Sequence, residues 1–80
     1  MSTLKPVKFT RHARNRMRLH GISESEAESV ISEPDFIEPS IEGRLNAWKK
    51  ASEKYLRVTY KEEDDKILVI STVRKKKVWR

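Results

Sequence analysis

Pro34 divides this sequence into two parts with different hydrophobic periodicities. Before it, apolar residues recur every three or four positions, as in amphipathic helices, and after it they alternate with polar residues, as in half-buried strands. Because proline cannot continue a helix, this change of period marks the boundary between a helical part and a strand part. A chain with this order buries its apolar residues by packing helices on a sheet.

The first helical segment extends from Phe9 to Gly21. Thr10 is a suitable N-cap, and Gly21 can take the left-handed conformation that ends a helix. On a helical wheel, one narrow arc should face the core: Phe9, Ala13, Met17 and His20. The opposite arc should face water, and it carries Arg11, Arg14 and Arg18. Since His20 adjoins Gly21, we expect it to cap the helix end rather than to act in catalysis.

His12 and Arg16 lie one turn apart on the border between these two arcs. A side chain at such a border is half-buried, so it can be held in place and still reach a ligand. This pair is therefore the feature of the sequence that bears most directly on function.

A second helix is predicted from Ile22 to the residue or two before Pro34. Ser23 and Glu26 have the spacing of a capping box, and Ile22 can pack onto Ala27 as a hydrophobic staple. Pro34 then stops the helix. The two helices are thus joined by a tight link of two residues, Gly21 and Ile22.

Four strand candidates follow Pro34: residues 36–41, 44–51, 55–60 and 67–73. The first contains Pro39 and should lie at an edge, while the last is apolar on both faces and should be the most buried, central strand. Residues 62–65 form a polar loop of hairpin length. The expected fold class is α+β, with two N-terminal helices packed on a curled four-stranded antiparallel sheet. We expect a single domain over residues 1–80, with residues 1–7 as a lead-in and 75–80 as a basic tail.

Composition removes several classes of protein. The chain has 80 residues and no cysteine, which leaves no disulfide framework or thiolate metal site and suits the cytoplasm. No segment has the apolar run of a signal peptide or a membrane span. The histidines are eight positions apart, not the four of a helical metal pair, and the sequence has neither a phosphate-binding glycine loop nor a nucleophile elbow.

The net charge of +6 is segregated along the chain. Residues 1–20 carry six bases and no acid, residues 21–43 carry seven acids and no base, and residues 66–80 are again basic without an acid. Such segregation favours a polyanion on one face, although a solvated surface with a basic tail explains it equally well. The candidate nucleic-acid-binding residues are Arg11, Arg14, Arg18, Lys75, Lys76 and Lys77.

Five short motifs of this chain resemble a known prokaryotic family. They are His-Ala-x-x-Arg-Met (12–17), His-Gly-Ile-Ser (20–23), Glu-x-x-x-x-Ile-x-x-Pro-Asp (26–35), Leu-Arg-Val-Thr-Tyr (56–60) and Ile-Leu-Val-Ile-Ser-Thr-Val-Arg (67–74). Together they resemble the family catalogued as domain of unknown function 4258, and they are similar to the BrnT toxins and the RelE/ParE-like small toxins. The resemblance implies two helices on a four-stranded antiparallel sheet. It also implies metal-independent RNA cleavage in the active members.

Cleavage of RNA without a metal needs a base, an acid and cations around the phosphate. His12 could serve as base or acid, and Arg16 as a phosphate clamp; Arg57, Thr72 and Arg74 would complete the site. The alternative for His12 is a structural hydrogen bond to the backbone, and for the arginines it is plain solvation. Four aromatic side chains could stack on bases or simply cover the core: Trp48, Trp79, Tyr55 and Tyr60.

Two departures from the toxin patterns concern the end of the chain. A lysine run and Trp79 follow the last strand, and the last tyrosine is Tyr60. We expect a toxin-type, metal-independent ribonuclease of a toxin–antitoxin pair, without a cofactor, whose partners are RNA, ribosome-associated RNA included, and a cognate antitoxin. Two alternatives stay open: a non-catalytic nucleic-acid-binding module on the same fold, and a protein-interaction domain whose acidic segment 24–42 meets a basic partner.

Overall fold

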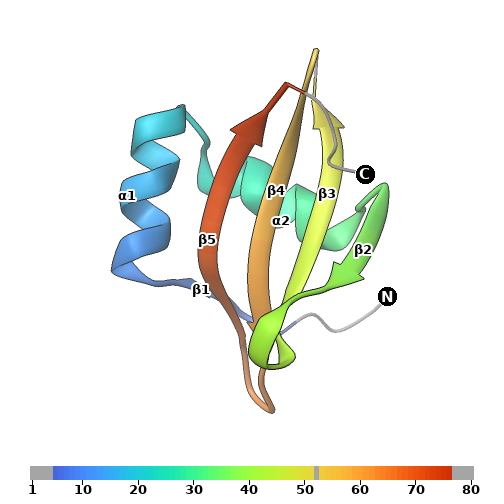
Figure 1. Ribbon diagram of the computed structural model, residues 1–80. Coiled ribbons are helices and arrows are strands. Elements are labelled where there is room, and N and C mark those ends of the chain that lie inside the picture. The colour runs from blue at the N-terminus through green and yellow to red at the C-terminus, as the bar shows by residue number, and fades with distance from the viewer. Residues whose placement is uncertain (1–4, 52, 77–80) are drawn as a thin grey trace.

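The structure, a computed structural model, describes residues 5–51 and 53–76 (Figure 1). Its elements in chain order are β1 (Val7–Phe9), α1 (Arg11–His20), α2 (Glu24–Ser32), β2 (Phe36–Pro39), a 3₁₀ turn (Ile41–Gly43), β3 (Leu45–Ala51), β4 (Lys54–Glu62) and β5 (Ile67–Lys75). The strands form one sheet in the order β1-β5-β4-β3-β2. The α+β class with two helices packed on a sheet is confirmed.

The sheet has five strands rather than the expected four, and it is mixed rather than antiparallel. The additional strand is β1, which pairs in parallel with β5 from Val7↔Ile67 to Phe9↔Val69. Backbone bonds extend this pairing, because Ile67 N donates to Pro6 O at 2.9 Å and Thr10 N donates to Val69 O at 3.0 Å. Three residues are too few to show a period of two, so the sequence does not predict this strand. The expectations that residues 1–7 are a lead-in and that the helix begins at Phe9 are wrong where they overlap β1.

The capping residues of both helices lie where the sequence predicts them, although α1 begins at Arg11 rather than Phe9 and α2 at Glu24 rather than Ile22. Thr10 Oγ1 accepts a hydrogen bond from Ala13 N at 3.0 Å, and Gly21 ends α1 in the left-handed conformation with φ of 68°. Ser23 and Glu26 form both bonds of the capping box, at 3.1 and 3.0 Å. These local signals define where both helices begin and where α1 ends.

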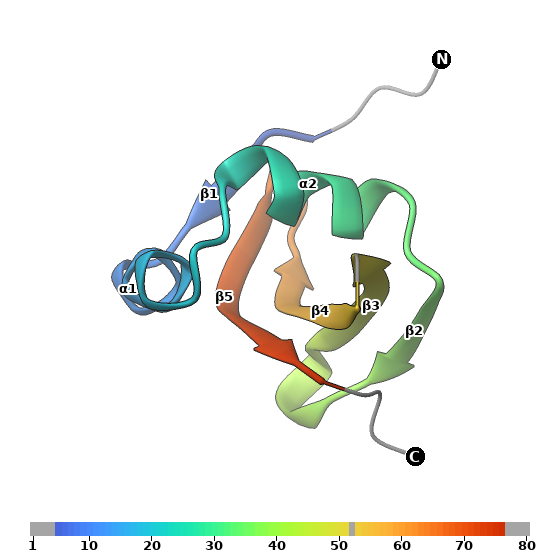
Figure 2. The same ribbon diagram turned by 90° about the horizontal axis from the view of Figure 1, so that it is seen from above.

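The two helices take different positions around the sheet. α2 crosses one face over β3 and β4, whereas α1 lies beside β5, at the sheet's edge (Figures 1 and 2). The core fills the space between the helices and the sheet. It consists of Ala13, Met17, Ile22, Ala27, Val30, Ala47, Leu56, Val58, Tyr60 and Val69. Within the described part of the chain, neither helix has the length or the apolar run that a membrane span requires.

The expectation that residues 67–73 form the central strand is wrong. The middle position belongs to β4, with β5 between β4 and the short β1. Because α1 packs along β5, apolar residues are favoured on both sides of that strand even though it lies near the edge. Edge position is correctly predicted for β2, which pairs only with β3 in the described sheet and contains Pro39.

Candidate nucleic-acid interface

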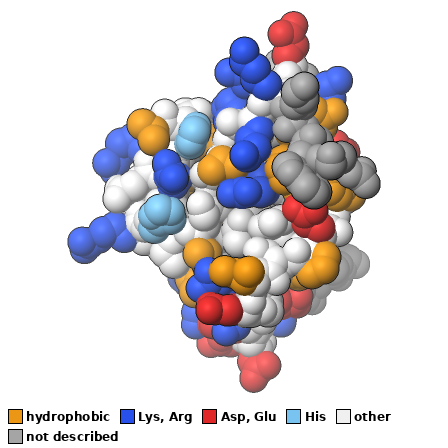
Figure 3. Space-filling view, viewed as in Figure 1, with side chains coloured by type: hydrophobic (Ala, Val, Ile, Leu, Met, Phe, Trp, Pro, Cys, Tyr) orange, Lys and Arg blue, Asp and Glu red, His pale blue; other side chains and the backbone are white. Residues whose placement is uncertain are grey.

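The sheet face turned away from α2 is here named the open face. Strand register places three cross-strand rows of side chains on it. The polar row consists of Glu38, Asn46, Thr59 and Ser71; the aromatic row of Phe36, Trp48, Arg57 and Val73; and the basic row of Lys50, Tyr55 and Lys75. The same face carries a concentration of Lys and Arg side chains over β5 and β4 (Figure 3).

Arg57 is held in place by its neighbours in these rows. Its guanidinium carbon lies 5.9 Å from the centre of the Trp48 ring. The Trp48 ring also stacks on the Phe36 ring, with the ring centres 5.9 Å apart and the ring planes inclined by 12°. Trp48 Nε1 donates to Glu38 Oε2 at 3.0 Å, which fixes the indole and brings a carboxylate near Arg57. Burial lowers the pKa of Arg57; Glu38 opposes this shift, and the charge of Arg16 adds to it.

Arg16, on α1, contributes to the electrostatic environment of Arg57, since its positive charge lowers the pKa of Arg57. Both side chains are half-buried. The Nε atoms of Arg16 and Arg57 are fully buried, and neither has a hydrogen-bond partner among the described residues. Two like charges that act on each other favour an anion, because an anion would offset their repulsion.

Two histidines flank Arg16, one turn away in each direction along α1. His12 is exposed rather than half-buried as expected, whereas His20 is half-buried. Both imidazoles face outward on the α1 side of the open face (Figure 3). The role of helix cap predicted for His20 is filled instead by Gly21 and by Arg74, and no hydrogen bond of the His20 imidazole occurs among the described residues. Part of each histidine is therefore accessible from solvent.

Thr72 and Arg74 are not brought to this cluster. Thr72 lies opposite Val58 on the core side of the sheet, with 0% exposure and an Oγ1 that has no hydrogen-bond partner among the described residues. Arg74, opposite Leu56, donates from Nε to His20 O and from a terminal nitrogen to Gly21 O, each at 3.2 Å. The structure thus gives Thr72 a place in the core and Arg74 a place at the end of α1.

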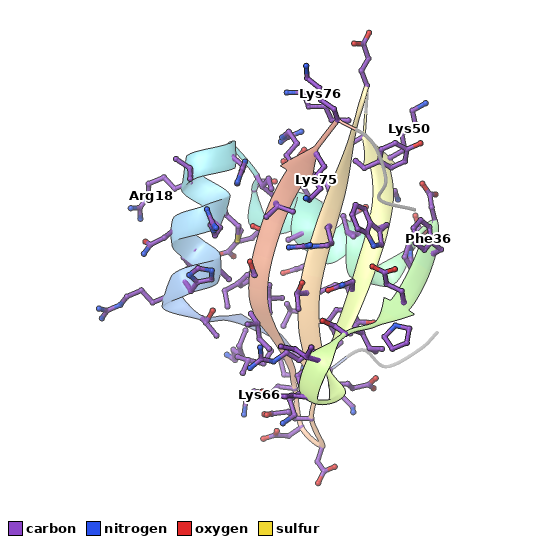
Figure 4. The ribbon with its side chains drawn as sticks, viewed as in Figure 1. Arg18, Phe36, Lys50, Lys66, Lys75 and Lys76 are labelled. Atoms are coloured by element: carbon purple, nitrogen blue, oxygen red, sulfur yellow. The ribbon has the colours of Figure 1, made fainter. Side chains whose placement is uncertain are left out.

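The predicted nucleic-acid-binding residues fall into two groups. Arg11, Arg14 and Arg18 are exposed on α1, and Arg18 points away from the sheet (Figure 4). Arg14 also pairs with Glu24 at 2.7 Å and lies over the Phe9 ring. Lys75 and Lys76 are exposed at the end of β5, and Lys77 lies outside the described residues. Only the second group adjoins the open face.

Sequence reasoning missed the contribution of β3 and β2. Lys50 shares the basic row with Lys75, and Glu38 binds Trp48 and Asn46, at 3.0 and 3.3 Å. A signal was present in the alternation of Asn46, Trp48 and Lys50 along β3, because the intervening Ala47 belongs to the core. The described His and acidic side chains form no group of three that could hold a metal ion.

Comparison with known proteins identifies the family but adds no relative of known activity. Neither the curated proteins nor the solved structures yielded a match. The similarity to BrnT and RelE/ParE-like toxins consequently rests on the motifs alone. The family model described as Domain of unknown function (DUF4258) matches residues 9–74, which is most of the chain, and the chain therefore belongs to this family.

Proposed function

We propose that this protein is a toxin-type, metal-independent ribonuclease that binds an RNA phosphate between Arg16 and Arg57. The observation that carries the proposal is the pair of arginines, whose buried Nε atoms have no partner among the described residues. A guanidinium group matches the geometry of a phosphate better than any other side chain does. His12 and His20 lie one turn before and one turn after Arg16 on α1, so they are the candidates for proton transfer at that phosphate.

The residues then divide the work of phosphodiester cleavage. His12 removes the proton from the RNA 2′-hydroxyl, and the 2′ oxygen attacks phosphorus. Arg16 and Arg57 stabilise the additional negative charge on the phosphorane. His20 donates a proton to the 5′ oxygen as its bond to phosphorus breaks, which leaves a 2′,3′-cyclic phosphate. The nucleophile belongs to the RNA, so the residues named require no activated water.

The biological setting follows from the resemblance to small toxins. A ribonuclease of this type acts on cellular RNA, ribosome-associated RNA included, and a cognate antitoxin protein restrains it. Inducing this chain alone in a bacterial host should arrest growth and fragment RNA. Co-expression of the protein encoded beside it should restore growth if that protein is the antitoxin.

The direct test is cleavage of RNA by the purified protein in the presence of a chelator. His12→Ala should lower the rate by about 10²–10⁴-fold, the usual contribution of a positioned acid or base. Arg16→Gln and Arg57→Gln should lower the rate as well, whereas Arg18→Gln, on the outer side of the same helix, is the matched control and should cleave normally. Equal cleavage by wild type and His12→Ala would refute the assignment.

A non-catalytic RNA-binding module is the second candidate. It is favoured by the placement of Thr72 in the core and of Arg74 at the end of α1, which leaves α1 as the source of every proton-transfer group proposed here. This candidate predicts that wild type binds RNA through Arg16 and Arg57 without cleaving it. Mass spectrometry of the RNA after incubation distinguishes the two candidates, because only cleavage produces cyclic phosphate ends.

A further inference from the structure

Tyr55 lies on the open face directly between two lysines. Register pairs it with Lys50 on β3 and with Lys75 on β5. Both lysines are exposed, and neither forms an ion pair among the described residues. Lys50 and Lys75 lie at the same end of the sheet, where β3 and β5 finish (Figure 4). The basic row is therefore an aromatic ring with a positive charge on either side.

This row adjoins the proposed phosphate site. Tyr55 and Arg57 are two positions apart on β4, so their side chains share a face and are separated by about 7 Å along the strand. Such a separation lets one nucleotide contact both rows. Arg57 is thus positioned to hold one phosphate while Tyr55 faces the neighbouring nucleotide.

Two other aromatic residues, Trp48 and Tyr60, are less accessible than Tyr55. Trp48 and Tyr60 expose only 1% and 5% of their surface, and Phe36 stacks on Trp48. Tyr55 is half-buried, so the residue is partly accessible from solvent. Base stacking on such rings is a general means of binding single strands.

We infer that the protein takes single-stranded RNA, with the base next to the Arg16–Arg57 phosphate stacked on Tyr55 and the flanking phosphate neutralised by Lys75 and Lys50. This inference rests on the proposed function and adds the form of its substrate. A base within a duplex is already stacked and paired, so it cannot lie flat on Tyr55. Duplex RNA can therefore interact with the open face only through the charged side chains there.

Binding of fluorescently labelled 2′-O-methyl oligonucleotides tests the inference, because these strands lack the hydroxyl needed for cleavage. Tyr55→Leu should weaken binding of a single strand by about 5- to 150-fold, whereas Tyr55→Phe, the matched control, should bind as wild type does. The affinity for a duplex of the same length should be unchanged in both variants. Equal single-strand binding by wild type and Tyr55→Leu would overturn the stacking site.

A second arm uses wild-type protein and so does not depend on the folding of a variant. A series of strands, each with one base removed at a different position, keeps every phosphate. One strand of this series should bind wild type more weakly, by the same factor by which Tyr55→Leu weakens binding of the intact strand. Tyr55→Leu should lose nothing further at that position. If no abasic position weakens binding while Arg57→Gln does, the stacking inference fails and the phosphate site stands. If the wild type binds no strand at low salt, the proposed function fails too.

Discussion

A substitution of Thr72 can show whether this polar residue of the core contributes to stability or to function. Its hydroxyl is fully buried without a hydrogen-bond partner among the described residues, and such a group costs free energy to bury. Thr72→Val keeps the shape and removes the hydroxyl, so it should raise the free energy of unfolding by about 1 kcal/mol. For a domain of this size that corresponds to roughly 4–8 °C in Tm, measurable by calorimetry.

RNA cleavage by the same variant provides the complementary measurement. Since Thr72 lies on the core side of β5, cleavage by Thr72→Val should equal that of wild type. If Thr72→Val is more stable than wild type but no longer cleaves RNA, Thr72 belongs to the catalytic site after all. Lower stability would show that the hydroxyl has a partner in the folded state.

The misplacement of Thr72 among the site residues has a physical cause. The sequence shows that Arg57 is on one face of β4 and that Leu56 and Val58 are on the other face, because side chains alternate along a strand. Whether Thr72 shares the face of Arg57 or of Val58 depends on the register between β4 and β5, which shifts at Thr59/Tyr60. A shift of one residue exchanges the two faces, and nothing in the local sequence specifies it.

At the level of elements, the structure assigns Arg74 to the attachment of α1. Its guanidinium group donates to the carbonyls of His20 and Gly21, which α1 leaves unpaired at its C-terminal end. Arg74→Gln should therefore lower the free energy of unfolding by about 1 kcal/mol. Amide hydrogen exchange should accelerate in α1 more than in α2, since only α1 loses a contact.

Arg18→Gln is the matched control for this prediction, because Arg18 is in the same helix end but points into solvent. It should leave both stability and exchange close to those of wild type. Uniform exchange across the two helices in Arg74→Gln would contradict a local role. Reduced RNA cleavage with unchanged exchange would indicate that Arg74 acts at the phosphate instead.

Elements with their own end signals were predictable, and elements defined by a partner were not. Thr10, Gly21 and the Ser23–Glu26 box carry the information for both helices within a few residues. β1 has no such signal, because its three residues become a strand only when β5 lies beside them. The position of α1 at the sheet's edge likewise depends on its contact with β5 rather than on its amphipathic pattern.

At the scale of the whole molecule, the charge blocks of the sequence become separate surfaces. The acidic residues of α2 lie on the helix-covered side, and the basic row lies on the open face with Arg16 and Arg57 beside it. The sequence predicted this segregation but could not place the blocks. The folded sheet is what places Lys50, from the middle of the chain, in one row with Lys75, on the other side of Tyr55.

This arrangement predicts how salt and charge reversal affect RNA binding. Each neutralised phosphate of a single strand contributes a slope of roughly 0.7 to the dependence of log affinity on log salt. Replacing both Lys50 and Lys75 by Gln should remove the neutralisation of the one phosphate that they share, so the slope should fall by about 0.7. Reversing Arg11, Arg14 and Arg18 to Glu should weaken binding at low salt only, since these side chains act through the field around α1 rather than by contact.

The matched control reverses charges on the acidic side. Glu28 and Glu33 are exposed on and just after α2, away from the open face, and replacing both by Lys changes the net charge by +4. If contacts on the open face determine binding, this variant should keep the wild-type slope and gain affinity only at low salt. A slope that follows net charge alone would fall about three times as far for the α1 variant, which changes the charge by −6, as for the Lys50/Lys75 variant, which changes it by −2. That result would show that RNA is attracted to the molecule without a defined site. A fall in slope for the Lys50/Lys75 variant with an unchanged slope for the α1 variant would place the RNA across the ends of β3 and β5, where the basic row lies.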